Sequence, residues 1–244
     1  MNLHKELLDA LKPLGDPQRA KHDRGYVNTQ LDLLGCNMPA IRSVTKQFSG
    51  ASDAELEAAW NASNSFDVLY SVLIIFGNRT LTERDWPRLK RWSRKIDNWA
   101  HSDTLSEMIA RLVESHPKQI YPDLQAWNTS KNPWQRRLSL TSLLYYHNSR
   151  SHRLPTSKIL PLVKARLHDE DIYVQKAVGW TLRESGNGDP EKTSAFIKKH
   201  LNELSAIAFS AATEKWSKKE KDQAKLARKS FRKQTTYARK TKTK

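Results

Sequence analysis

The chain has 244 residues, with 42 Lys and Arg against 26 Asp and Glu, so its formal charge at pH 7 is +16. This length suffices for a hydrophobic core, and eight Trp residues with a 38% hydrophobic fraction argue against a disordered chain. A single cysteine, Cys36, excludes an internal disulfide framework and a cysteine-based zinc site. No run of 18 apolar residues and no signal-peptide pattern is present, so we expect a soluble, intracellular protein.

The positive charge is concentrated at the C-terminus. Residues 215–244 hold 13 Lys and Arg and 2 Asp and Glu, a net charge of +11, whereas the preceding 214 residues have a net charge of +5. Such a segment favours a polyanionic partner, most simply nucleic acid, because Lys and Arg neutralise phosphates and release counterions. A tail that merely improves solubility is the alternative.

Between the turn signals of the sequence, apolar residues recur at helical spacing. The first part of the chain predicts a helix with a stripe at Leu3, Leu7, Leu8 and Leu11, a helix opened by Pro39, a helix behind the capping box Ser52-x-x-Glu55, a buried helix over residues 66–76, and a basic helix that starts at Thr82-x-x-Asp85. Further helices are expected near residues 104–115, 119–128, 133–147, 156–168, 170–185, 191–202 and 204–216.

The fold class follows from these segments. The chain has few glycines and prolines, eight and ten, and no convincing two-residue alternation typical of a strand. From residue 119 onward the helix pairs recur at roughly 35 to 40 residues, near the periods of helical solenoid repeats. We therefore predict an all-α fold, a curved α-solenoid of antiparallel helix pairs whose concave face suits an elongated partner.

Motifs of several enzyme classes are missing from the sequence. It has no Gly-rich phosphate loop, no His-Glu-x-x-His, no Cys–His pairing and no Gly-x-Ser-x-Gly, and its eight His residues are scattered. We therefore expect no metal, no nucleotide cofactor and no catalytic triad.

The first of three unusual segments contains Trp99 and Asp103. The two residues are four apart, so a helix presents both on one face. The apolar stripe that follows, from Leu105 to Leu112, points largely away from Asp103. In the structural alternative, Asp103 is a first-turn acid favoured by the helix dipole, with Trp99 packed beneath it.

The second segment opens at Pro133, which begins a helix with Trp134 and Arg137 on one stripe. A buried cation requires a partner, so Arg137 holds either an internal carboxylate or a phosphate. Arg136 is expected to face solvent or phosphate. In the third segment, residues 173–183, Trp180 shares a helix face with Tyr173 and Ala177. Gly179 allows close approach of a helix or a ligand. Ordinary core packing is the alternative there.

Together these segments resemble the DNA alkylation repair family typified by the AlkD DNA glycosylases, which are built from HEAT-like helical repeats. The resemblance covers nearly all of residues 1–214. Its motifs are Tyr26-Val27-x5-Leu33-Leu34-Gly35-x3-Pro39-x2-Arg42, Trp99-x3-Asp103, Trp134-x2-Arg137 and, the most specific, Gln175-Lys176-Ala177-Val178-Gly179-Trp180-x-Leu182-Arg183.

The resemblance implies the roles of individual residues. In the family two tryptophans and an aspartate face the lesion, and an arginine contacts the DNA backbone. By motif, the catalytic residues here are Asp103, Trp99 and Trp180, and the DNA-binding residues are Arg137, Arg136, Tyr26 and Lys176. One departure is Ala100, because the family has an acidic residue directly after the first tryptophan.

The implied activity is hydrolysis of the N-glycosidic bond of positively charged N3- or N7-alkylpurines in duplex DNA, without metal or cofactor. The reaction passes through an oxocarbenium-like sugar, which Asp103 would stabilise while orienting the attacking water. The faces of Trp99 and Trp180 would add cation–π attraction of ~0.5–2 kcal/mol each. We expect a monomer in the cytoplasm, nucleoid-associated in a bacterium.

The resemblance leaves one alternative open, a non-catalytic helical-repeat protein that binds nucleic acid or protein on its concave face. Asp103 beside two tryptophans distinguishes the two, because a carboxylate facing phosphates is a liability to a pure binder. The expected domains are a glycosylase domain over 1–214 and a basic tail over 215–244. The tail has few large apolar groups, so we predict it to be disordered, or at most a loosely docked helix over Lys218–Lys233, with truncation at Glu214 leaving the fold unchanged.

Overall fold

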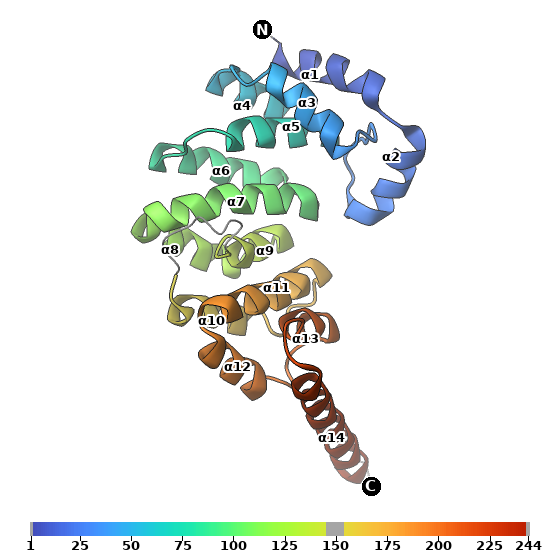
Figure 1. Ribbon diagram of the computed structural model, residues 1–244, viewed down its shortest axis with the longest axis vertical. Helices are drawn as coiled ribbons and strands as arrows, with labels where there is room; N and C mark the ends of the chain where they lie inside the picture. Colours follow the sequence, from blue (N-terminus) through green and yellow to red (C-terminus); the bar gives the residue numbers. More distant parts are fainter. Residues whose placement is uncertain (1, 145–153, 243–244) are drawn as a thin grey trace. The chain divides into compact units, whose positions relative to one another are not determined.

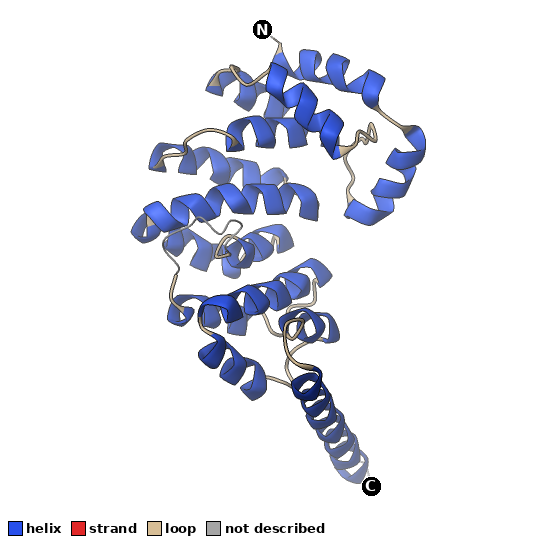
Figure 2. Cartoon of the chain, viewed as in Figure 1, coloured by secondary structure: helices blue, strands red, loops and turns tan. Residues whose placement is uncertain are grey.

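A computed structural model of the protein describes residues 2–144 and 154–242 (Figure 1). In these ranges the chain is helical, with no β-strand and one isolated bridge between Asp32 and Ser65 (Figure 2). The all-α fold is therefore confirmed. The chain forms two compact units, Met1–Ile120 and Tyr121–Lys244.

The N-terminal unit consists of helices joined by short connections. Its α-helices are α1 (Leu3–Leu11), α2 (Pro17–Asp23), α3 (Met38–Gln47), α4 (Asp53–Ala62), α5 (Phe66–Gly77), α6 (Trp86–Trp92) and α7 (Trp99–Ser115). Four single turns join them, namely η1 (Lys12–Leu14), η2 (Arg24–Asn28), η3 (Glu83–Asp85) and η4 (Ser93–Lys95), of which η2 is a π-turn.

The C-terminal unit begins within α8 and is also helical. Its α-helices are α8 (Pro117–Asn128), α9 (Pro133–Thr141), α10 (Thr156–Ala165), α11 (Ile172–Gly188), α12 (Pro190–Lys199), α13 (Ala206–Ala212) and α14 (Lys218–Lys242).

Within each unit, helices pack against the next but one along the chain. In the N-terminal unit α3 packs on α5 and α5 on α7, and in the C-terminal unit α9 packs on α11 and α11 on α13. This is the packing of an α-solenoid, in which a helix pair buries its apolar side against the following pair. The predicted solenoid class is therefore confirmed.

The helix starts follow the capping signals of the sequence. The Ser52 side chain accepts from the backbone amide of Glu55, whose carboxylate accepts from the Ser52 amide, so the predicted capping box is present. Helix α5 is buried on nearly all sides, as its composition predicts. The helix expected over 133–147 ends earlier, at Thr141, and residues 145–147 lie outside the described residues.

Cationic side chains of later helices satisfy the carbonyl groups at the ends of earlier ones. The Lys95 ammonium donates to the carbonyl of Trp60 at 2.7 Å, near the end of α4. Arg111 of α7 donates to the carbonyl of Gly77 at 2.6 Å, at the end of α5. The last carbonyls of a helix have no partner within it, so these contacts both cap the helix and bind one element to the next.

The C-terminal segment differs from its expected form. It is a helix as far as Lys242, and in its described part Ala224 and Arg228 are only 6% and 8% exposed. Arg228 donates to the carbonyl of Leu204 at 2.9 Å and to that of Leu201. The helical alternative for this segment is therefore the one observed, and it extends beyond Lys233. A chain ended at Glu214 would lose the contacts of Arg228, and an unchanged fold after that truncation stays a prediction.

Gly179 marks the closest approach of α11 and α13. A Cβ atom at this position would lie 2.7 Å from the Ala208 carbonyl oxygen and 2.7 Å from the Ala211 Cβ. Of the two expectations for this glycine, the structure supports the approach of a helix.

We predict that Gly179→Ala lowers the free energy of unfolding by ~1–3 kcal/mol, because backbone atoms of α13 would have to move. Gly186→Ala is the matched control, since the nearest atom to its added Cβ is 3.9 Å away, in Thr193. In the control the better helix propensity of Ala should leave stability equal or raised by up to ~1 kcal/mol. Urea titration measures both, and equal effects of the two changes would contradict the packing described.

Candidate functional site

In the N-terminal unit, Trp99 packs against Tyr26. The two rings meet edge to face with centroids 5.3 Å apart, and the indole Nε1–H of Trp99 donates to the Tyr26 carbonyl at 3.1 Å. Trp99 is partly exposed and Tyr26 is 63% exposed. Because the indole N–H is bound internally, the orientation of Trp99 is fixed while part of its ring remains open to a ligand.

The backbone around Tyr26 has an unusual conformation. Tyr26 lies in the π-turn Arg24–Asn28, and Asn28 at its end has φ +54°, the left-handed region that asparagine tolerates. The Arg24 guanidinium donates to the Thr29 carbonyl at 3.4 Å. Neither feature has a periodic signal in the sequence, so this turn was not predicted.

Asp97 binds this turn to the start of α7. Its carboxylate accepts from the Thr29 hydroxyl at 2.7 Å, from the Gln30 backbone amide at 2.8 Å and from the Asn98 side-chain amide at 2.9 Å. These three donors hold Asp97 in a supporting position, and it fixes where α7 begins relative to Tyr26. Sequence analysis missed Asp97, although an Asp-Asn pair before an apolar stripe is a signal for a helix start.

Asn98 caps α7 and orients a buried histidine. Its side-chain oxygen accepts from the His101 backbone amide at 2.9 Å, and its amide donates to His101 Nδ1 at 3.0 Å. His101 Nε2 therefore carries the proton and donates to the Phe66 carbonyl at 3.1 Å, while the imidazole stacks on the Phe66 ring at 4.4 Å. Burial lowers the pKa of His101 to about 4, so the ring is neutral at pH 7.

Asp103 lies one turn after Trp99 on the same helix and is partly exposed. Since α7 begins at Trp99 and not near residue 104, Asp103 belongs to the second helical turn, and the alternative of a first-turn acid is wrong. Ala100, at the position where the resemblance implies an acidic residue, is only 6% exposed.

Arg136 in the C-terminal unit does not point into solvent as expected. Its side chain is 16% exposed and forms a bidentate pair with Asp169, with Nε–Oδ2 and Nη2–Oδ1 distances of 2.7 and 3.0 Å. Burial alone would raise the pKa of Asp169, but hydrogen bonds from Arg136 and from the Asp171 amide hold that pKa below its usual value. This pair connects α9 to the turn before α11.

Arg137 is also internal. It is 4% exposed, and its Nη1 donates to the carbonyl of Tyr173 in α11 at 2.8 Å. The neighbouring rings of Trp134 and Tyr173 have centroids 5.0 Å apart. The expected partners of Arg137 were an internal carboxylate or a phosphate. The contact described here is to a backbone carbonyl instead, and it joins α9 to α11.

The most specific sequence motif lies on α11 and combines structural and exposed positions. Gln175 is buried and donates to the carbonyl of Asp169 at 2.8 Å and to two others in the preceding turn. Lys176 is exposed, with its ammonium 4.9 Å from the centroid of the Tyr173 ring. Trp180 is partly exposed, one turn further along. Much of the motif therefore maintains the fold, which leaves Lys176 and Trp180 as its candidates for ligand contact.

The structure thus brings Tyr26, Trp99 and Asp103 together in the N-terminal unit. The other candidates, Arg136, Arg137, Lys176 and Trp180, belong to the C-terminal unit.

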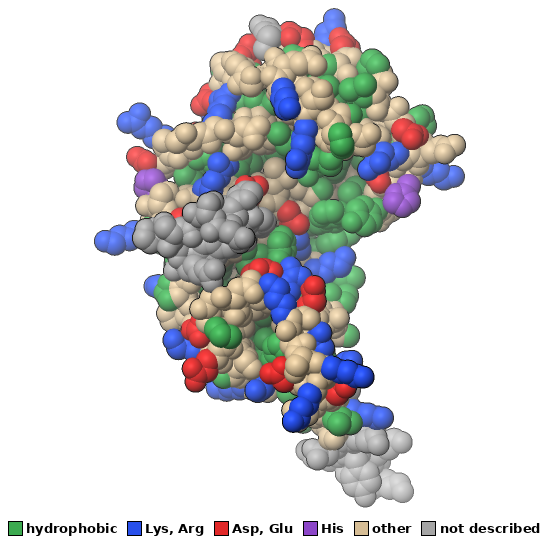
Figure 3. Space-filling view, in the orientation of Figure 1, with side chains coloured by type: hydrophobic (Ala, Val, Ile, Leu, Met, Phe, Trp, Pro, Cys, Tyr) green, Lys and Arg blue, Asp and Glu red, His purple; other side chains and the backbone are tan. Residues whose placement is uncertain are grey.

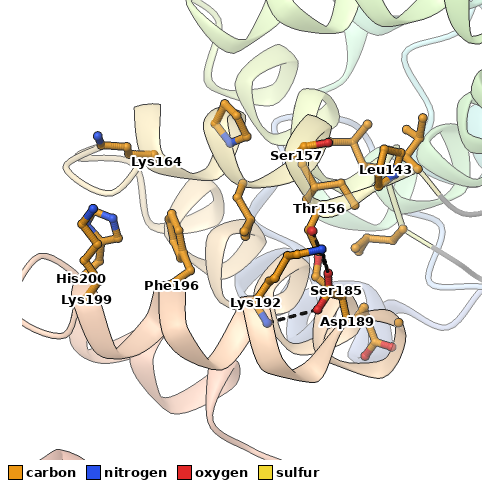
Figure 4. Close-up of a pocket in the computed structure, with 18 residues that line it drawn as sticks. Leu143, Thr156, Ser157, Lys164, Ser185, Asp189, Lys192, Phe196, Lys199 and His200 are labelled. Carbon is orange, nitrogen blue, oxygen red and sulfur yellow. Dashed lines mark hydrogen bonds and ion pairs between the residues drawn. The ribbon is translucent and has the colours of Figure 1, made fainter.

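A groove of about 760 Å³ lies in the C-terminal unit between α10, α11 and α12, and none of the candidate residues lines it (Figure 4). At one end Asp189 accepts from Thr156 at 3.0 Å and pairs with Lys192 at 3.2 Å. Phe196 and His200 line the groove further along. Sequence analysis did not predict this groove.

In the part of the chain that the structure describes, no group of three or more His, Cys, Asp or Glu side chains could hold a metal ion. None of its helices is long and apolar enough to cross a membrane.

The sequence profile of the family described as DNA alkylation repair enzyme matches residues 7–216, most of the chain. The protein therefore belongs to the DNA alkylation repair enzyme family, as the motifs around Trp99 and Trp180 indicated. No curated protein matches the sequence.

Two solved structures share the fold. One, described as a predicted DNA alkylation repair enzyme from Enterococcus faecalis, is 18% identical with a TM-score of 0.69 over 84% of this chain and 97% of its own. The other is the Pseudomonas fluorescens alkylpurine DNA glycosylase AlkC bound to DNA containing an abasic site analog, 16% identical with a TM-score of 0.51. That match covers 87% of this chain and 60% of the glycosylase.

We predict that Asp97→Asn destabilises the protein by ~1–3 kcal/mol, because an uncharged amide is a poor acceptor for three converging donors. The ¹⁵N–¹H resonance of the Trp99 indole, assigned with Trp99→Phe, should shift as its contact with Tyr26 loosens. The exposed Asp32→Asn, which removes the same charge in the same unit, should leave that resonance in place. An unmoved Trp99 resonance in Asp97→Asn would mean that Asp97 does not position this site.

His101 predicts a pH dependence of stability. Its pKa is about 4 in the folded protein and near 6.5 when unfolded, so between these values the unfolded chain binds more protons and stability falls as pH falls. The free energy of unfolding should be about 2 kcal/mol lower at pH 5 than at pH 7. His101→Phe should remove most of that difference, whereas the exposed His168→Gln should retain it. An undiminished pH dependence in His101→Phe would assign the effect to other groups.

Proposed function

We propose that the protein is a DNA-alkylpurine N-glycosylase, a hydrolase that excises positively charged N3- or N7-alkylated purines from duplex DNA. The observation that carries the proposal is the pair Trp99 and Asp103, one turn apart on α7 and both partly exposed, with Trp99 held in place by Tyr26. Membership of the repair family and the alkylpurine glycosylase activity of the structural neighbour AlkC support it.

Asp103 has the chemistry that the reaction requires. Alkylation at N3 or N7 puts positive charge on the purine, and loss of the base leaves an oxocarbenium-like sugar. A carboxylate beside that sugar stabilises the developing charge and orients the water that attacks C1′. In the N-terminal unit Asp97 is a poor candidate for this role, since its oxygens already accept from Thr29, Gln30 and Asn98.

The aromatic residues complement the carboxylate. The open part of the Trp99 ring offers an electron-rich face to a cationic base or sugar, and we assign the same role to Trp180. The Trp99 ring would also exclude water from the neighbouring Asp103 carboxylate, which strengthens its field.

The contacts with the DNA backbone are assigned to exposed residues, namely Tyr26 and Lys176. Arg136 and Arg137 are assigned to the support of α11, because their side chains are engaged with Asp169 and with the Tyr173 carbonyl. A direct phosphate contact by Arg137 would need its buried side chain to move out.

We further propose that the protein resembles the AlkD branch of the family. The support is the order and spacing of Trp99-x3-Asp103, Trp134-x2-Arg137 and the α11 motif that ends at Trp180. We also propose a cytoplasmic monomer with its glycosylase domain over residues 1–214.

The test is release of free base from methylated duplex DNA by the full chain. Asp103→Asn keeps the size of the side chain and removes its charge, so base release should fall by ~10²-fold or more, as in other losses of a key electrostatic group. Glu107→Gln is the matched control, because it removes the same charge one turn further along α7, and it should retain activity.

Unchanged release by Asp103→Asn would contradict its role. If the wild-type protein binds duplex DNA and releases no base, the alternative of a non-catalytic helical-repeat protein is the correct one.

A further inference from the structure

Helix α14 lies beyond the part of the chain that matches the repair family, which ends at residue 216. The segment 215–244 carries a net charge of +11 out of the +16 of the whole chain. The family comparison therefore assigns no function to the most basic element of the protein.

One side of α14 is fixed to the C-terminal unit. Ser217 and Glu220 form a capping box at its start, and the Lys221 ammonium donates to the Glu214 carbonyl at 2.7 Å. Ala224 and Arg228 are buried, and the Arg228 guanidinium lies 4.5 Å from the centroid of the Phe209 ring. Since Lys221, Ala224 and Arg228 are three and four residues apart, a single stripe of the helix is docked.

A neighbouring side of α14 presents lysines to solvent. Lys218, Lys225 and Lys229 are exposed, and their spacing of seven and four residues places them on one flank over roughly 16 Å of helix. Figure 3 shows blue basic side chains over the described part of α14. The Lys225 ammonium forms a long ion pair with Asp222, at 4.0 Å.

The charge and the shape of this helix fit a nucleic acid better than a membrane surface. Its exposed large apolar residues in the described part are Leu226 and Phe231, at 64% and 48% exposure. Five residues separate them, about 140° around the helix, so they form no common apolar face that could enter a lipid surface. A row of lysines, in contrast, matches the regular row of phosphates on duplex DNA.

We propose that α14 is a DNA-binding arm, in which the flank of Lys218, Lys225 and Lys229 contacts backbone phosphates and Arg228 fixes the arm to the C-terminal unit. The proposal rests on the proposed DNA substrate and adds a second contact surface to it. Phosphate contacts carry no information on the base, so the arm holds damaged and undamaged duplex equally. It raises the time that the protein spends on DNA without selecting lesions.

The test compares two triple variants of the full chain by fluorescence anisotropy with an undamaged duplex over a range of salt concentrations. In the arm variant, Lys218→Gln, Lys225→Gln and Lys229→Gln, the slope of log K against log salt should fall by about 2–3 units, since each lost phosphate contact removes about 0.9. The control variant, Lys5→Gln, Lys46→Gln and Lys118→Gln, removes the same charge from exposed sites elsewhere, and its slope should change by less than about one unit. Equal slope changes in the two variants, or an unchanged slope in the arm variant, would overturn the proposal.

Two further measurements distinguish DNA binding by α14 from membrane binding and from the glycosylase activity. In the first, vesicles of phosphatidylcholine and phosphatidylserine replace the duplex. If the arm variant loses vesicle binding but keeps DNA binding, α14 binds a membrane and the proposal is overturned. Base release at saturating protein should be the same in the arm variant as in the wild type. A wild-type protein that releases no base but shows the slope difference would refute the glycosylase and leave the arm intact.

Discussion

Asp97 lies just before α7 and accepts hydrogen bonds from Thr29 and Gln30, which precede it by 68 and 67 residues in the sequence. This contact fixes the π-turn that carries Tyr26 against the first residue of α7, Trp99. The partly exposed ring of Trp99 and the position of Asp103 one turn later both depend on this contact, because α7 starts where Asp97 and Asn98 place it. A surface ion pair adds little to stability, whereas three hydrogen bonds to the Asp97 carboxylate fix its position.

The helical repeats explain why a site of this kind contains few polar residues of its own. Each helix packs on the next but one, and the contacts that join them use cations such as Lys95, Arg111 and Arg136 to satisfy carbonyl and carboxylate groups. These cations are therefore occupied within the scaffold. On the proposed function, DNA contact then falls to exposed residues such as Lys176 and to the lysines of α14.

The sequence predicted the fold class well, because local signals decide where these helices begin. The Ser52 capping box, Pro133 at the start of α9 and the apolar run of α5 were all read correctly from neighbouring residues. The resemblance to the repair family, carried by Trp99, Asp103 and the α11 motif, led to the family that the profile match establishes.

Features that depend on distant partners were not predictable in the same way. The expected solvent exposure of Arg136 failed because its carboxylate partner, Asp169, is 33 residues away. Burial of Arg228 was missed for the same reason, since the carbonyls that it binds belong to residues 201 and 204. The π-turn at Tyr26 and its support by Asp97 have no periodic pattern, so they emerge only from the folded chain.

The central claim is that this scaffold breaks a glycosidic bond, and the most direct measurement is the product itself. Methylated duplex DNA is incubated with the full chain in the presence of a metal chelator, and the free bases and the abasic sites are quantified by mass spectrometry. The account predicts release of N7-methylguanine or N3-methyladenine above the buffer rate, with one abasic site formed for each base released. Duplex binding with no base released above that rate would contradict it.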